Sequence, residues 1–94
     1  MFVILVYDVD ARRDSKVLKI CRQYLNHMQN SVFEGHITEA KLKSLCDELK
    51  NIMIPESDSC LIYQMSSTKY CRKIAYGSVS FQSGDIIDDN PLII

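Results

Sequence analysis

The chain opens with the stretch Met1-Phe2-Val3-Ile4-Leu5-Val6-Tyr7, which is apolar throughout and meets its first charge at Asp8. A continuous β-branched and aromatic run of this kind is typical of a central strand that is covered on both faces. The run is too short to cross a membrane or to form the core of a signal peptide, and no basic leader precedes it. We therefore expect a strand from Phe2 to Tyr7, a cytoplasmic location and no membrane partner.

Helical periodicity begins soon after this strand. Asp14 or Ser15 can cap a helix at this point. The apolar residues that follow recur at helical spacing and are Val17, Ile20, Cys21, Tyr24, Leu25 and Met28. The period then changes between Met28 and Ile37, where a tight turn near Asn30-Ser31 predicts two short strands that pair with each other.

A second helix is predicted after these strands. Thr38 can cap it and Pro55 ends it. Its apolar stripe consists of Leu42, Leu45, Cys46, Leu49, Ile52 and Met53. The turn-prone segment Glu56-Ser57-Asp58-Ser59 precedes a strand from Cys60 to Met65. A basic connection from Lys69 to Lys73 then leads to a last strand from Ile74 to Phe81.

The order of these elements, β-α-β-β-α-β with an extra strand, is that of the ferredoxin-like split βαβ layout. We therefore predict one α+β domain over residues 1–94, a ferredoxin-like sandwich with an antiparallel sheet. Its tail, residues 82–94, ends on Leu92-Ile93-Ile94, which should be docked rather than left in water. The pattern leaves two docking sites open, the chain's own sheet or the edge of a partner's sheet.

The composition fits a single small domain. The 94 residues, 47% of them hydrophobic, can form one core and would gain stability by burying more surface in a dimer. The cysteines Cys21, Cys46, Cys60 and Cys71 form no C-x-x-C pair, which argues against a zinc site. Because Cys21 and Cys46 fall on the apolar helix stripes, we expect reduced structural thiols.

Basic residues gather locally although the whole chain is nearly neutral. With 11 basic and 12 acidic side chains, the net charge is −1, so a nucleic-acid signal must be a local basic face. Against the single acid Asp14, the first helix and its approach carry Arg12, Arg13, Lys16, Lys19 and Arg22. A second group surrounds Tyr70 and consists of Lys69, Arg72 and Lys73. Most charged helix faces are simply solvated, but the scarcity of balancing acids here favours phosphate binding.

Two carboxylates, Asp8 and Asp10, follow directly on the first strand. Mg²⁺ takes oxygen ligands and often uses one or two carboxylates together with water and substrate phosphate. Aspartates also commonly end strands and begin turns, and the pattern alone favours this structural interpretation. His27 and His36 have no metal-ligand spacing; either could act as a base, but a surface or interface role is more common.

Three strings of this sequence resemble the family of the second universal CRISPR-associated protein, written here as Cas-two. They are Val3-Ile4-Leu5-Val6-Tyr7-Asp8-Val9 followed by Arg12-Arg13, then Gln29-Asn30-Ser31-Val32-Phe33-Glu34-Gly35, then Asp58-Ser59 leading into Leu61-Ile62-Tyr63. The spacing of the strings matches the family over roughly the first two thirds of the chain. The chain departs from the family where Leu25-Asn26 stands in place of a glycine after the first helix.

The resemblance implies a ferredoxin-like homodimer in which each chain's C-terminal segment, here residues 82–94, crosses onto its partner's sheet. It implies partnership with the CRISPR integrase, Cas-one, in capturing foreign DNA as new spacers. It also implies a Mg²⁺-dependent endonuclease that acts on single-stranded RNA or double-stranded DNA. Asp8 would be its catalytic metal ligand, with one Mg²⁺ ion shared between the two Asp8 side chains of the dimer.

The first functional hypothesis is therefore a phosphodiesterase. A metal at Asp8 would activate water for attack on a phosphate. Arg12 or Arg13 would steady the charge that develops there. Motif position assigns supporting roles to Asp10, Ser31 and Phe33.

The second hypothesis is a non-catalytic scaffold, a dimer whose basic first helix grips duplex DNA for the integrase. The residues that would contact DNA are Arg12, Arg13, Lys16, Lys19 and Arg22. A weaker alternative is a ferredoxin-like regulatory module that binds a small ligand. A nuclease assay with Mg²⁺ or EDTA, on wild type and on Asp8→Ala, separates the first two hypotheses.

Overall fold

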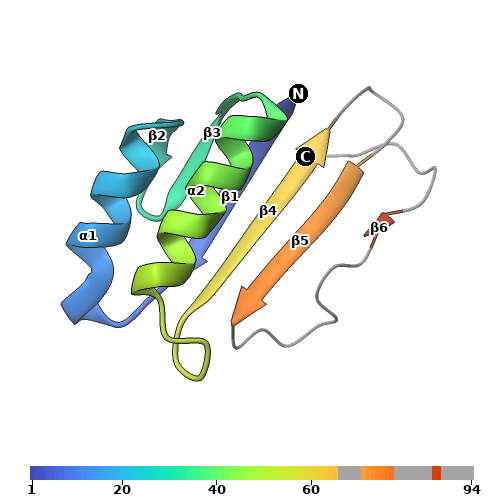
Figure 1. The fold of residues 1–94 in the computed structure, drawn as a ribbon. Helices are drawn as coiled ribbons and strands as arrows, with labels where there is room; N and C mark the ends of the chain where they lie inside the picture. The colour runs from blue at the N-terminus through green and yellow to red at the C-terminus, as the bar shows by residue number, and fades with distance from the viewer. Residues whose placement is uncertain (66–70, 78–85, 88–94) are drawn as a thin grey trace.

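The computed structural model describes residues 1–65, 71–77 and 86–87. In chain order its elements are β1 (Phe2–Asp8), α1 (Ala11–Arg22), β2 (Asn26–Gln29), β3 (Val32–His36), α2 (Glu39–Ile52), β4 (Ser59–Met65), β5 (Cys71–Gly77) and β6 (Ile86–Ile87). The strands form one sheet in the order β2-β3-β1-β4-β5-β6, and all neighbours in it are antiparallel. Both helices lie on the same face of this sheet (Figure 1). Neither of the described helices is long and apolar enough to cross a membrane.

This architecture confirms the predicted ferredoxin-like α+β fold with an extra strand. β1 lies between β3 and β4, so the first strand of the chain is central as expected. Each helix connects two strands that are not neighbours in the sheet, which is the split βαβ arrangement.

Helix α1 begins and ends earlier than the sequence predicted. Its N-cap is Asp10, whose side chain accepts from the backbone N–H of Arg12 at 2.9 Å, so neither Asp14 nor Ser15 caps it. After Arg22 the chain extends into β2, and Met28, predicted on the helical stripe, lies on that strand with 52% of its surface exposed. Pairing with β3 outweighs the helical spacing of these residues.

The structure confirms the predicted turn at Asn30-Ser31 between β2 and β3. It also confirms the predicted second helix, α2. Asn30 lies in the hairpin turn with a φ of 43°, a left-handed conformation that asparagine tolerates better than most residues. The Thr38 hydroxyl caps α2 by accepting from the backbone N–H of Lys41 at 3.2 Å. α2 ends before Pro55, which cannot continue a helix.

The core lies between the helices and one face of the sheet. Burial alternates along β1, and the strand side chains turned toward the helices are buried: Val3, Leu5, Tyr7, Phe33 and Ile62. The opposite face of the sheet is only half-buried and carries Phe2, Ile4, Val6, Leu61 and Tyr63. The prediction that β1 is covered on both faces is therefore wrong for a single chain, because both helices lie on the same side.

Strand β5 begins earlier than predicted. It covers Cys71–Gly77 rather than starting at Ile74, so part of the expected basic connection belongs to the strand. Residues 78–81, the predicted end of that strand, lie outside the described residues. β6 pairs with Cys71 and Arg72 of its own chain, whereas docking of residues 82–94 on a partner stays a prediction.

The described cysteine side chains are free thiols, as predicted. Cys21 and Cys60 are buried and Cys46 is half-buried, while the side chain of Cys71 lies outside the described part of the chain. Burial raises the pKa of Cys21 to about 12 and raises the pKa of Cys46 and of Cys60 as well. These thiols therefore stay neutral and act as small apolar side chains.

Candidate functional site

Asp8 is held at the end of the central strand. Its main chain pairs with Ser59 of β4, and the buried side chains of Leu5 and Tyr7 fix the register of β1. The alternation along β1 leaves the Asp8 carboxylate exposed. Within the described residues, no hydrogen bond or ion pair occupies it. The carboxylate is therefore available to a ligand.

Asp8 lines an open hollow of about 330 Å³. Three parts of the fold line it: the end of β1, the first turns of α1 and the β2–β3 turn. The lining residues are Tyr7, Asp8, Val9, Asp14, Asn30 and Ser31. The backbone N–H of Tyr7 donates to the carbonyl of Ser31 at 3.1 Å, which ties the turn to the strand. Burial and, second, the nearby Asp14 carboxylate raise the pKa of Tyr7 to about 12, so its phenol stays protonated.

The donors in this hollow are of the kind that a hard cation takes. Carboxylate, amide and hydroxyl oxygens suit Mg²⁺, which commonly keeps water and phosphate in its shell. In the part of the chain that the structure describes, no group of three or more His, Cys, Asp or Glu side chains gathers. A cation at Asp8 would therefore need further ligands from water, from a substrate phosphate or from a second copy of the chain.

Asp10 has a different environment from Asp8, although the two are only two residues apart. Its carboxylate accepts from the Arg12 guanidinium at 2.9 and 3.2 Å and from the Arg12 backbone N–H at 2.9 Å. These hydrogen bonds lower the pKa of Asp10 to about 2. Asp10 is thus occupied as the cap of α1, while the Arg12 side chain remains 81% exposed.

Arg13 pairs with a carboxylate that the sequence analysis treated only as part of a turn. The Asp58 side chain is fully buried and accepts from Arg13 Nε at 2.6 Å and from Arg13 Nη2 at 3.0 Å. It also accepts the backbone N–H groups of Asp10 at 3.0 Å and Ile54 at 2.9 Å. The hydrogen bonds from Arg13 outweigh burial and hold the pKa of Asp58 far below its usual range. This pairing gives Arg13 a structural role.

The remaining basic residues of α1 form an exposed face. Lys16, Lys19 and Arg22 are exposed, whereas Val17, Ile20 and Cys21 of the same helix are buried. No ion pair among the described residues neutralises these three side chains. In the second basic group, Arg72 is exposed and Lys73 is half-buried on β5, while Lys69 and Tyr70 lie outside the described residues.

The two supporting residues predicted from the second string, Ser31 and Phe33, lie in different surroundings. Ser31 lines the Asp8 hollow. Phe33 is fully buried and stacks on Tyr7 with ring centroids 6.1 Å apart. Phe33 therefore supports the site from the core and does not line the hollow.

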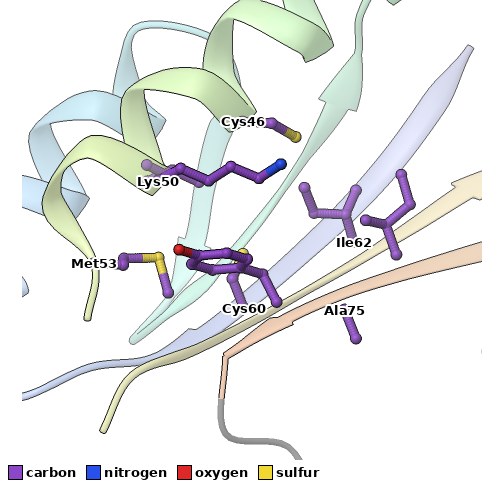
Figure 2. A pocket seen from close by; sticks show the side chains of 9 residues that line it. Cys46, Lys50, Met53, Cys60, Ile62 and Ala75 are labelled. Atoms are coloured by element: carbon purple, nitrogen blue, oxygen red, sulfur yellow. The ribbon is translucent and has the colours of Figure 1, made fainter. Parts of the chain in front are cut away.

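A second hollow, of about 110 Å³, lies between α2 and strands β4 and β5. Cys46, Lys50 and Met53 reach it from the helix side and Ile62 from β4, while the Ala75 side chain on β5 points away from α2 (Figure 2). The Lys50 ammonium lies over the Tyr76 ring, 5.8 Å from its centroid. This lining is mostly apolar and brings no carboxylate, so the hollow offers nothing that would bind a hard cation.

Residues 1–73 match the sequence model of the family described as CRISPR associated protein Cas2. The chain belongs to the Cas2 family. This membership confirms the resemblance of the three strings, and it places Asp8 and the whole hollow around it inside the matched region.

Individual Cas2 proteins agree with this assignment. A Dictyoglomus turgidum protein named CRISPR-associated endoribonuclease Cas2 is 49% identical over 77 residues, which are 82% of this chain and 88% of that protein. A protein of the same name from Methanosarcina acetivorans is 36% identical over 87 residues, 93% of this chain and 100% of that protein. The crystal structure of Streptococcus pyogenes Cas2 at pH 6.5 matches with a TM-score of 0.65 and 32% identity, covering 70% of this chain and 87% of that chain.

Sequence reasoning missed the role of Asp58 in this Cas2 family member. The sequence pattern did not indicate that Asp58 is buried, because Asp58 lies among polar turn residues. Two of its partners, Asp10 and Arg13, are also distant in the chain. The pairing of Asp58 with Arg13 spans 45 positions. One signal was present, since Asp58-Ser59 begins the third string that resembles the family.

We expect Asp58→Ala to lower the free energy of unfolding by about 3–5 kcal/mol, because it leaves the Arg13 guanidinium and two backbone N–H groups without their acceptor. Chemical denaturation monitored by circular dichroism measures this change. Asp47→Ala is the matched control: Asp47 pairs with Lys43 at 3.5 Å on an exposed helix face, and its loss should cost less than about 1 kcal/mol. Equal losses in the two variants would contradict the structural role of Asp58.

The pH dependence of stability gives a second measurement of the same pair. Folding lowers the pKa of Asp58, so its contribution is present above the ordinary aspartate pKa of about 3.9 and is lost as pH falls below it. The wild type should therefore lose stability from about pH 4 downward. Asp58→Ala should lose less over the same range, and parallel curves would argue against the assignment.

Proposed function

We propose that this chain is a metal-dependent endonuclease that cleaves phosphodiester bonds of nucleic acid at Asp8. The observation that carries this proposal is the exposed, unpaired Asp8 carboxylate in a hollow lined by oxygen donors. The name of the relatives, CRISPR-associated endoribonuclease Cas2, supports nuclease activity and RNA as a substrate, and we propose that this RNA is single-stranded. Double-stranded DNA is the other substrate of the proposal.

Asp8 would hold the metal, which we propose to be Mg²⁺, and Asp14 and Asn30 would add oxygen donors from the same hollow. A bound Mg²⁺ ion supplies a Lewis acid for the phosphate and lowers the pKa of a bound water. Arg12 has an exposed guanidinium that can exchange its Asp10 partner for a phosphate oxygen and donate to it. Ser31 contributes a hydroxyl at the rim of the hollow.

The proposal includes a homodimer formed through the uncovered face of the sheet. That face carries Ile4 at its centre, between Glu34 of β3 and Tyr63 of β4. The surrounding side chains are Phe2, Val6 and Leu61. A half-buried apolar face of this kind gains stability when a second copy covers it. A dimer would also bring a second Asp8 to a site at which one carboxylate is sparse for a cation.

The same dimer would act in CRISPR adaptation, with the integrase Cas-one and DNA as partners. The basic face of α1 supports this part of the proposal, since Lys16, Lys19 and Arg22 are exposed and lack acidic partners among the described residues. This face would contact phosphates without reading base sequence. It equally supports the second candidate function, a non-catalytic DNA-binding scaffold.

We expect Asp8→Asn to keep the fold and to reduce Mg²⁺-stimulated cleavage of single-stranded RNA by at least about a hundredfold, because an amide lacks the charge that holds the cation. Gel assays with Mg²⁺ or EDTA measure this loss. Asp10→Asn makes the same change at a carboxylate that Arg12 already occupies, and it should reduce cleavage less. Wild-type cleavage by Asp8→Asn would contradict the assignment of the site.

Replacing Lys16, Lys19 and Arg22 together by Gln should weaken duplex DNA binding. The dependence of log affinity on log salt should flatten by roughly one unit for each phosphate that the variant no longer neutralises. Fluorescence anisotropy at several salt concentrations measures both effects. The control replaces Lys41, Lys43 and Lys50 of α2 by Gln, which removes the same charge from the other helix. If both triple variants bind alike, the α1 face does not bind the DNA.

Ile4→Glu should convert the dimer to a folded monomer at micromolar concentration, because it would bury a charge in the contact. Losing one buried isoleucine costs about 1.5–3 kcal/mol, so the dissociation constant should rise at least about tenfold. Sedimentation velocity measures the change. Met28→Glu alters an equally apolar but 52% exposed side chain on the edge strand β2 and should leave the dimer intact. A dimer of Ile4→Glu as tight as the wild type would exclude this face.

A further inference from the structure

His27 is held by ring stacking at the edge of the sheet. It lies on β2 opposite Phe33 of β3, and the two rings stack with centroids 4.6 Å apart and an interplanar angle of 18°. Phe33 stacks in turn on Tyr7, at 6.1 Å and 25°. Three rings thus form a ladder from the edge strand to Tyr7, the residue next to Asp8.

The imidazole also makes a hydrogen bond to the hairpin turn. His27 Nε2 lies 2.6 Å from the carbonyl oxygen of Asn30. A carbonyl oxygen can only accept, so Nε2 must carry the hydrogen, and both the neutral Nε2–H tautomer and the imidazolium satisfy this. Asn30 has a left-handed φ of 43°, and the pairing register shifts between His27 and Gln29. Such irregularities often re-aim side chains beside functional sites.

The turn that receives this hydrogen bond forms one wall of the Asp8 hollow. Asn30 and Ser31 line the hollow, and the Ser31 carbonyl accepts the N–H of Tyr7 at 3.1 Å. The turn is therefore fixed on one side by β1 and on the other side by His27. From these contacts we infer that His27 is a positioning residue for the Asp8 site: its Nε2–H holds Asn30 and Ser31 in place against the hollow. This inference rests on the proposed cleavage at Asp8.

Two substitutions separate the roles of the His27 ring and of its hydrogen. His27→Phe keeps an aromatic ring for the stack on Phe33 and removes the donor. His27→Gln loses the ring and places an amide N–H near the position of Nε2. The matched control is His36→Phe, because His36 is also exposed but lies at the far end of β3, edge-on to Phe2 with centroids 5.2 Å apart.

The first readout is steady-state cleavage of single-stranded RNA with Mg²⁺. We expect His27→Phe to lower kcat about fivefold with little change in KM, which is the size of one net hydrogen bond, and His27→Gln to recover most of the loss. His36→Phe should cleave like the wild type. Wild-type kcat in His27→Phe, or an equal loss in His27→Gln, would overturn the inference. If Asp8→Asn also cleaves like the wild type, the proposed function itself has failed.

The second readout does not depend on cleavage. Hydrogen exchange of the Tyr7 amide, which donates to Ser31, should be about fivefold faster in His27→Phe than in the wild type, and unchanged in His36→Phe. In the wild type, NMR should show a protected Nε2–H resonance from His27. If His27→Phe does not fold, this resonance decides: a neutral ring with its hydrogen on Nδ1 overturns the inference.

Discussion

The buried carboxylate of Asp58 connects the parts of the chain that surround the site. It accepts from the Arg13 guanidinium on α1, from the Asp10 N–H between β1 and α1, and from the Ile54 N–H just past α2. A charge with no exposed surface is costly unless it is fully paired. Because these partners come from the start of α1 and from the end of α2, Asp58 can be satisfied only when these two parts of the chain meet.

This constraint explains why two neighbouring aspartates differ. Asp10 is turned into the cap of α1 and paired with Arg12, and its backbone is fixed by Asp58. Asp8 is fixed by strand pairing with Ser59 but has no partner for its carboxylate among the described residues. The Asp10 carboxylate is thus paired within the fold, whereas the Asp8 carboxylate is available to a ligand.

Much of the fold could be predicted because it depends on local patterns. The apolar run of β1, the Thr38 cap and the turn at Asn30 are each set by residues close in sequence. The extent of α1 could not be predicted in the same way, since Tyr24, Leu25 and Met28 continue the helical spacing but the chain leaves the helix to pair with β3. The uncovered face of β1 also escaped prediction, because the sequence of an apolar strand is the same whether a helix of its own chain or a second chain covers it.

The sequence analysis proposed Asp8 as the centre of the candidate site but missed the residues that support it. Asp8 stood out through the resemblance to the Cas2 family. The match over residues 1–73 confirms that resemblance, whereas the role of Asp8 stays a prediction. Asp58 and His27 escaped because their roles arise from contacts made in three dimensions, with Arg13 and with the turn at Asn30. Arg13 was expected to contact phosphate, but its guanidinium pairs with the buried Asp58 carboxylate.

The central claim is that the exposed Asp8 carboxylates of two chains hold one shared cation. Measuring the number of metal ions bound per chain tests this claim most directly. Titration with Mn²⁺, a spectroscopic substitute for Mg²⁺, followed by electron paramagnetic resonance of the free ion, counts the bound ions. The account predicts one ion for every two chains in the wild type and no such binding in Asp8→Asn. Unchanged binding in Asp8→Asn, or one ion for each single chain, would contradict it.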